Sequence, residues 1–482
     1  MSDSLSRKFW VAGSLLIAVV LVGALPGCSK PASKKAPNAK PSEAATSEKA
    51  APEKVLEKAP ESAPEKAPES APEKAPESAP EKAPESAPEK APESAPEKAP
   101  ESTPDKAPES VPEMAPESVP EKAPESVPEK APESATVKAP VPAQLLVELP
   151  ASCNTPDGMA LLPDNSIILS VPNFNVATQP SLLIRITPDN QAETFYEFTM
   201  PYPGLTAPID RISPMGIVYS PSNNSLYFAD MQLAEMNQNS RLWRLELKDG
   251  KVDRMVLVAS GFNVSNGLTI QDDYLYVTES VLRSSTDPKP AEGVEPPATF
   301  QDPLISAVMR FKLDEENVQL SKPLESDPHV IATLKSHKTA WPFGADGIAF
   351  DSKGNLFVGA FGDGIMYKLT FDAAGNVVSN EEFAKDPRMI NCDGMSCDKT
   401  TDKLYVADSA ANAIQIINPD GSVETLAVND DVTDKRSGML DQPCEALLRG
   451  DTIVVSNMDW PFPGFKNKGY QLPATLSVIP LK

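Results

Sequence analysis

The chain has 482 residues and a formal net charge of −24, from 44 Lys and Arg against 68 Asp and Glu. An acid excess of this size disfavours a nucleic-acid partner and favours cations or a solvated acidic surface. Half of the 52 prolines lie before residue 143, so the N-terminal part differs in composition from the rest of the chain.

Residues 1–27 have the features of an export signal. Arg7 and Lys8 precede the 17-residue apolar run FWVAGSLLIAVVLVGAL, and small residues then lead to Cys28. A Cys directly after such a run resembles the lipobox of bacterial lipoproteins, which implies that Cys28 is acylated. The alternative is a plain membrane anchor, because the run is only just long enough to span a bilayer. The lipoprotein interpretation predicts a lipid-anchored protein of the bacterial cell envelope, and Ser29 suggests the outer membrane, facing the periplasm or the surface.

Residues 28–142 are built mainly on the eight-residue unit APEKAPES. Frequent proline removes backbone donors and fixes φ, so neither a sheet nor a packed helix can form. We therefore predict a disordered tether with polyproline II character. A repeated peptide ligand for another protein is the alternative.

The remaining residues, 143–482, repeat one β pattern six times. Each copy contains an apolar strand, a tight turn and a second apolar strand. The copies read PDGMALLPDNSIILS from Pro156, PMGIVYSPSNNSLYFAD from Pro214, SNGLTIQDDYLYVTES from Ser265, ADGIAFDSKGNLFVGA from Ala345, CDGMSCDKTTDKLYVAD from Cys392 and CEALLRGDTIVVSN from Cys444. Further hairpins follow the copies, among them RLWRLELKDGKVDRMVLV and AVMRFKLDEENVQL.

The spacing of the copies predicts the fold class. Equivalent positions lie 58, 51, 80, 47 and 52 residues apart, which suits four short strands per unit. The sixth unit supplies only three strands, and QLLVELP at 144–150 is the missing fourth. We predict an all-β fold, a six-bladed β-propeller of four-stranded antiparallel blades, in which this N-terminal strand closes the ring and removes exposed edges.

One position at the head of each first strand is mostly polar. It is occupied in chain order by Asp157, Met215, Asn266, Asp346, Asp393 and Glu445. First strands of propeller blades line the central channel and begin on one face, so these side chains are expected to meet at one mouth. The second strands return to the same face with Asp230, Glu279, Asp408 and Asn457. Long segments are also predicted there, at 200–213, 281–305, 326–344 and 458–474, and such loops usually carry binding sites.

Four carboxylates gathered at one mouth would repel each other and take up protons unless a cation lies among them. Oxygen ligands favour Ca²⁺, with Zn²⁺ or Mn²⁺ as alternatives. We therefore predict a divalent metal ion bound by Asp157, Asn266, Asp346, Asp393 and Glu445. The alternative is a hydrated polar ring that satisfies the amides at the strand ends.

The motifs SNGLTI and ADGIAFDSKGNLFVGA resemble the regucalcin/gluconolactonase family and, more distantly, the strictosidine synthase and paraoxonase propellers, over roughly residues 150–482. The resemblance implies that Asn266 and Asp346 hold a divalent metal and that Asp157 replaces a metal-binding Glu. It also implies that Asp346 is catalytic, as the proton acceptor for the attacking water in lactone hydrolysis, and that Arg211 binds substrate. PMGIV departs from the family's Asn-Asp-Gly in the second blade.

Four cysteines follow Cys28, namely Cys153, Cys392, Cys397 and Cys444. An exported protein could join them in two disulfides, with three pairings to choose from, or keep them as free buried thiols.

Two functions remain open at this point. The first is an envelope-anchored, divalent-metal-dependent hydrolase of lactone-like or other small esters. The second is a non-catalytic propeller that binds a small ligand or a partner protein at its loop face. In both cases we expect a monomer that contacts the membrane through its lipid anchor.

Overall fold

The computed structural model describes residues 139–482, except 177, 202–210, 233–237, 284–302, 338–340, 432–436 and 461. The predicted signal peptide (1–27) and the predicted tether, up to residue 138, lie outside this part of the chain. Within the described residues, no helix is both long enough and apolar enough to cross a bilayer.

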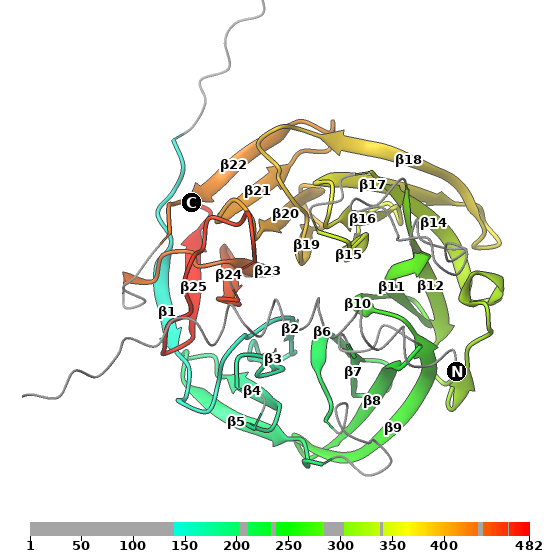
Figure 1. Ribbon diagram of the computed structural model, residues 1–482, viewed down its shortest axis with the longest axis horizontal. Helices are drawn as coiled ribbons and strands as arrows, with labels where there is room; N and C mark the ends of the chain where they lie inside the picture. Colours follow the sequence, from blue (N-terminus) through cyan, green and yellow to red (C-terminus); the bar gives the residue numbers. More distant parts are fainter. Residues whose placement is uncertain are drawn as a thin grey trace, which may run out of the picture. The chain divides into compact units, whose positions relative to one another are not determined.

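Six antiparallel sheets surround a central axis, which confirms the six-bladed β-propeller (Figure 1). Blade one contains β2 (Met159–Leu161), β3 (Ile167–Val171), β4 (Leu182–Ile186) and β5 (Ala192–Glu197). Blade two contains β6 (Pro214–Ser220), β7 (Ser225–Asp230), β8 (Ser240–Lys248) and β9 (Lys251–Phe262). Blade three contains β10 (Ser265–Gln271), β11 (Tyr274–Arg283), β12 (Leu304–Lys312) and β14 (Val330–Ser336).

The second half of the ring follows the same plan. Blade four contains β15 (Ala345–Phe350), β16 (Leu356–Ala360), β17 (Ile365–Phe371) and β18 (Val377–Lys385). Blade five contains β19 (Met395–Asp398), β20 (Lys403–Asp408), β21 (Ala413–Ile417) and β22 (Val423–Val428). Blade six contains β23 (Pro443–Arg449), β24 (Thr452–Asn457), β25 (Thr475–Pro480) and β1 (Gln144–Glu148).

The predicted ring closure is present. Strand β1 pairs antiparallel with β25, with Glu148 opposite Thr475, and the cyan and red strands lie side by side in Figure 1. Leu149 is buried in the cluster that joins blades six and one. On the other side, the Val141 amide donates to the Leu426 carbonyl of blade five at 2.7 Å. The N-terminal segment therefore contacts three blades.

Blade three differs from the prediction. AVMRFKLDEENVQL is not a hairpin of this blade, because β13 (Val318–Gln319) crosses to blade two and pairs in parallel with β9. The fourth strand is β14, which lies in the segment predicted to be a long loop. The cause is burial, since Leu313, Leu320 and Leu324 fill the space between blades two and three. Residues 313–329, here called the blade-three insertion, also contain the 3₁₀ helix η1 (Leu324–Ser326).

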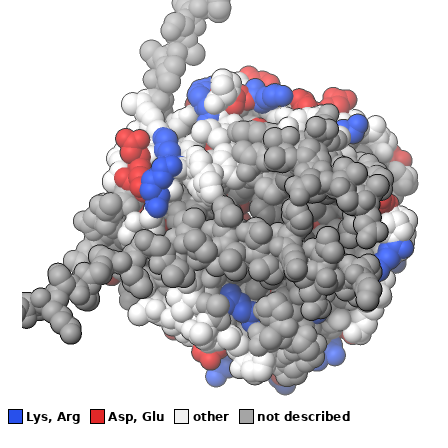
Figure 2. Space-filling model, in the orientation of Figure 1, with Lys and Arg blue, Asp and Glu red and all other residues white. Residues whose placement is uncertain are grey.

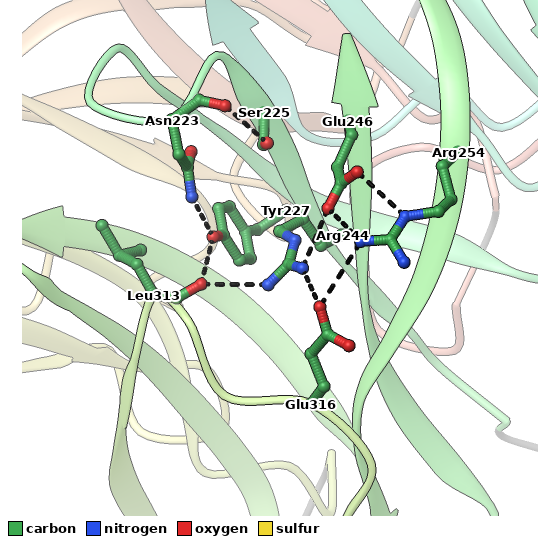
Figure 3. A network of polar contacts seen from close by, with 8 residues as sticks. All are labelled: Asn223, Ser225, Tyr227, Arg244, Glu246, Arg254, Leu313 and Glu316. Carbon is green, nitrogen blue, oxygen red and sulfur yellow. Dashed lines mark hydrogen bonds and ion pairs between the residues drawn. The ribbon is translucent and has the colours of Figure 1, made fainter.

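A polar network fixes the blade-three insertion to blade two (Figure 3). The buried Arg244 guanidinium on β8 contacts the carboxylates of Glu246 and Glu316, and its Nη1 donates to the Leu313 carbonyl at 3.1 Å. The Tyr227 hydroxyl donates to the same carbonyl at 2.7 Å. Because these donors are buried, the network stabilises the insertion where it leaves blade three. Charged side chains of both signs otherwise lie around the rim of the propeller (Figure 2).

Candidate functional site

The recurring polar positions lie where the inner strands begin, and four of these strands are irregular there. The pairing of inner and second strand shifts between Pro214 and Ile217 in blade two, with corresponding shifts in blades three, four and six. A β-bulge redirects the side chains next to it. Asn266, Asp346 and Glu445 lie at three of these bulges, whereas Asp157 and Asp393 precede inner strands with regular pairing.

Close packing between neighbouring blades explains why glycine follows most of these positions. A Cβ on Gly347 would lie 2.1 Å from the Asp393 carbonyl oxygen of the next blade, and one on Gly267 would lie 2.3 Å from the Asp346 carbonyl oxygen. Real Cβ atoms do not approach an oxygen so closely. Only glycine lets the inner strands of neighbouring blades approach this closely.

One small cavity lies inside the ring of inner strands. Its lining includes all five of the predicted metal ligands, which are Asp157, Asn266, Asp346, Asp393 and Glu445. Its volume is about 30 Å³, which is enough for a water molecule or a cation but far too small for an organic substrate. Met215 is not part of the lining. The structure thus brings the predicted residues together, while their role as ligands stays a prediction.

The carboxylates of this ring have unfavourable surroundings. Asp157 is 5% exposed, and burial raises its pKa from 3.8 to about 7. Burial, followed by repulsion from Asp393, Asp157 and Glu445, raises the pKa of Asp346 well above its ordinary value. The pKa values of Asp393 and Glu445 are also well raised, first by burial and then by neighbouring carboxylates. The ring therefore favours protons or a bound cation at neutral pH.

Hydrogen bonds orient individual members of the ring. The Asn266 side-chain Nδ2 donates to Asp346 Oδ1 at 2.8 Å. The side-chain oxygen of Asn266, Oδ1, is therefore the atom left for a ligand. The Asp393 carboxylate accepts from the Gly394 amide at 3.0 Å and from the Ser409 hydroxyl. The Ala446 amide donates to Glu445 Oε1 at 3.1 Å.

The donor atoms fit a hard divalent cation in type, because carboxylate and amide oxygens are the preferred ligands of Ca²⁺. In the described part of the chain, however, no three His, Cys, Asp or Glu side chains are close enough together to hold a metal ion. The ring therefore has suitable chemistry without a preassembled set of three such ligands.

The acids at the ends of the second strands have a structural role instead. Asp230 Oδ1 accepts from the Ser213 amide at 2.8 Å, and Glu279 accepts from the amides of Asn263 and Val264, each at 2.8 Å. Asp408 and Asn457 accept from backbone amides in the same way. These side chains hold the segment that enters each inner strand, and none of them lines the cavity. Asn173, which was not among the predicted residues, does the same in blade one.

Arg211 is not part of the cavity lining. Its guanidinium donates to the Pro172 carbonyl and lies over the Phe174 ring, 5.7 Å from the centroid. The backbone carbonyl of Arg211 accepts from Gln232 Nε2 at 3.0 Å. Its predicted contact with substrate remains a prediction.

The four described cysteines are free thiols. Of the two alternatives predicted for them, two disulfides or free buried thiols, the structure therefore has the free thiols. The Cys444 thiol also lines the small cavity between the inner strands, here called the acid cavity. It donates to the Pro156 carbonyl at 3.1 Å. Burial, together with nearby carboxylates, raises its pKa well above 9.0. Cys444 is therefore a neutral thiol rather than a nucleophile.

An aromatic surface that was not predicted lies next to the ring. We call Phe174, Phe343, Trp460 and Phe462, all partly exposed, the aromatic rim. Trp460 stacks on Phe174 with ring centroids 4.9 Å apart, and it contacts Phe462 at 4.9 Å. The signal was visible as WPFG at 341–344 and WPFPGF at 460–465, because such aromatic density in loops is unusual.

Comparisons with known proteins bear on the fold alone. No family model matches the chain, and no curated protein matches it. Similar solved structures include a gluconolactonase from Xanthomonas campestris, with 13% identity, 72% of this chain and 99% of that chain covered, and a TM-score of 0.44. They also include the calcium-binding protein regucalcin from Agrobacterium tumefaciens, with 12% identity, 71% and 95% covered, and a TM-score of 0.43. A PQQ-bound aldose sugar dehydrogenase from Streptomyces coelicolor has 16% identity, 71% and 99% covered, and a TM-score of 0.41.

The six-bladed β-propeller itself rests on the strand order of the chain. One fold can support many activities, so function has to be argued from the site.

The raised pKa values predict how stability depends on pH. Between pH 3.8 and about pH 7, the native state binds more protons at Asp157 than the unfolded chain does. Asp157 therefore adds to the free energy of unfolding at low pH, and this contribution is lost as the pH rises through the folded-state pKa of about 7. In chelator, the free energy of unfolding should therefore fall between about pH 5 and pH 8. Denaturant titrations across this range measure the free energy of unfolding. Asp393→Asn removes a second carboxylate whose pKa is raised, so this free energy should fall less steeply with pH in the variant. A stability that rises with pH would contradict the prediction.

Proposed function

We propose that the propeller is a divalent-metal-dependent hydrolase of lactones or other small esters. The observation that carries the proposal is the meeting of four carboxylates and one amide in a cavity large enough for a single ion. Ca²⁺ is the expected ion because every donor is an oxygen, and Zn²⁺ and Mn²⁺ are the alternatives.

Asp157, Asn266 and Asp346 would hold the ion, with Asp393 and Glu445 beside them. When bound, the ion supplies a Lewis acid that polarises an ester carbonyl and lowers the pKa of water. Asp346 has the role of proton acceptor for the attacking water. The hydrogen bond from Asn266 to Asp346 Oδ1 orients this carboxylate and leaves Oδ2 for the proton.

The test combines metal analysis with an activity assay. Chelator-treated protein should lose hydrolysis of a set of lactones and regain it with one of Ca²⁺, Zn²⁺ or Mn²⁺. Asp346→Asn should be inactive with every ion, whereas Asp253→Asn, at an exposed position of β9, should retain activity. An active Asp346→Asn protein would remove this residue from the mechanism, and full activity in chelator would remove the metal.

Non-catalytic ligand binding is the second candidate. It is favoured by the lack, among the described residues, of three His, Cys, Asp or Glu side chains placed to hold an ion. Calorimetry with the same lactones separates the two, since binding without turnover in the presence of each ion supports this candidate.

We further propose that the protein is a monomer held to the bacterial envelope by a lipid on Cys28. Replacing Cys28 with Ser removes the acceptor of that lipid, so the variant should move from the membrane fraction to the soluble fraction or keep an uncleaved signal. Fractionation followed by mass spectrometry of the N-terminus measures this. A wild-type protein without lipid at Cys28 would contradict the anchor.

A further inference from the structure

We infer that the loop face binds a ligand with an apolar ring or acyl chain, which packs on the aromatic rim while its polar end reaches the acid cavity. That this polar end is a lactone or ester rests on the proposed function. The apolar character of the ligand is argued independently, from the residues around the mouth.

The aromatic rim continues directly from the acid cavity. Phe174, Phe343 and Trp460 pack in one cluster with Met215 and Cys444, and Cys444 also lines the cavity. Because the cavity holds only about 30 Å³, any organic molecule that reaches its carboxylates must keep its body outside. Such a body would then lie against this cluster, which shares Cys444 with the cavity lining.

The aromatic rim is supported by a rigid layer beneath it. The Phe465 side chain is fully buried and contacts Phe462 at 5.3 Å and Trp341 at 4.9 Å, measured between ring centroids. Trp341 Nε1 donates to the Pro463 carbonyl at 3.1 Å, which ties the loop of blade six to the loop before β15. The Lys466 amide donates to the Ala410 carbonyl of blade five at 3.1 Å. Phe462 and the loops that carry Trp341 and Phe465 are therefore held in place before a ligand arrives, which lowers the entropy lost on binding.

Two backbone amides of the aromatic rim already have side-chain partners. Thr155 Oγ1 accepts from the Phe174 amide at 2.9 Å, and Gln442 Oε1 accepts from the Trp460 amide at 2.6 Å. Asn175 Nδ2 donates to the Asp459 carbonyl at 3.2 Å, but the buried Asn175 Oδ1 has no hydrogen-bond partner. A polyhydroxylated lactone would bury hydroxyl groups here without partners, which is costly. An apolar ligand fits better.

Two non-hydrolysable lactams test this selectivity without turnover. The purified full chain is titrated by calorimetry with 3,4-dihydro-2-quinolinone, which has an aryl ring and one N–H, and with gluconolactam, which is polyhydroxylated. We expect the aryl lactam to bind at least about tenfold more tightly, because its ring displaces water from aromatic surface. Equal affinities, or tighter binding of gluconolactam, would overturn the inference.

Variants locate the binding. Trp460→Ala should weaken the aryl lactam by about tenfold, and Trp460→Phe should restore most of the affinity, because the ring face is kept. Phe195→Ala, in the cleft between blades one and two, is the matched control and should bind like the wild type. If Trp460→Ala folds normally by circular dichroism and binds like the wild type, the aromatic rim is not the site.

The two proposals fail in different ways. If the aryl lactam binds as expected but dihydrocoumarin is not hydrolysed with any of the three ions, the hydrolase is wrong and the apolar ligand stands. If gluconolactone is hydrolysed faster than dihydrocoumarin, the hydrolase stands and the apolar ligand is wrong.

Discussion

Asp346→Asn should raise the thermal midpoint of the metal-free protein by a few degrees and should remove most of its stabilisation by Ca²⁺. Without an ion, the change relieves repulsion with Asp157, Asp393 and Glu445, and the new amide still accepts the hydrogen bond from Asn266. With an ion, the wild type gains about 2.7 kcal/mol when Ca²⁺ is a hundredfold above its Kd, and the variant gains much less.

Paired melts of both proteins in chelator and in millimolar Ca²⁺ measure this reversal of sign. Asp253→Asn controls for the change in net charge, because Asp253 is exposed on β9, three strands away from the inner strand β6, and does not line the cavity. Wild-type midpoints that do not respond to Ca²⁺ would exclude calcium, and repeating the melts with Zn²⁺ and Mn²⁺ then tests the remaining ions. A ring that holds only water predicts no reversal.

Deleting residues 143–150 should cost most of the stability of the propeller. The deletion removes β1, exposes the hydrogen-bonding edge of β25 and takes Leu149 out of the cluster between blades six and one. An exposed edge of this kind also pairs with other chains, so we expect aggregation. Thermal melts and size-exclusion chromatography measure both effects.

The matched control for this deletion removes residues 31–138 and keeps both β1 and the Val141 contact with blade five. Because those residues are predicted to be a disordered tether, the thermal midpoint should stay unchanged within error. If the chain without residues 143–150 is a stable monomer, the closure by β1 does not support the fold. A drop of several degrees in the control would mean that the repeat packs on the propeller.

The fold was largely predictable because its strands carry local signals. In the β15–β16 hairpin, Asp351 Oδ1 accepts from the amides of Lys353 and Asn355, and Gly354 has a φ of +81°. Such Asx turns can be read from four or five residues. The path of β13 could not be read this way, because its destination depends on an apolar gap between two blades.

The meeting of Asp157, Asn266 and Asp346 was predictable for a related reason. Each has an equivalent place in a repeat, and repeats around one axis put equivalent places at one mouth. The fate of Asp230 and Glu279 was not predictable, because the sequence does not show whether a carboxylate faces a cavity or a backbone amide. The aromatic rim depends on contacts between loops of blades one, four and six, which no local pattern encodes.

The closure by β1 also makes the ring mechanically asymmetric. Gln144 at the start of β1 lies opposite Val478 near the end of β25. The N-terminal end of β1 and the C-terminal end of β25 therefore lie at the same end of the strand pair. A force that pulls residue 143 away from residue 482 therefore loads the hydrogen bonds one pair after another, as in a zipper, instead of all together. The ring should open at this seam at low force, while the hairpins inside the other five blades still hold.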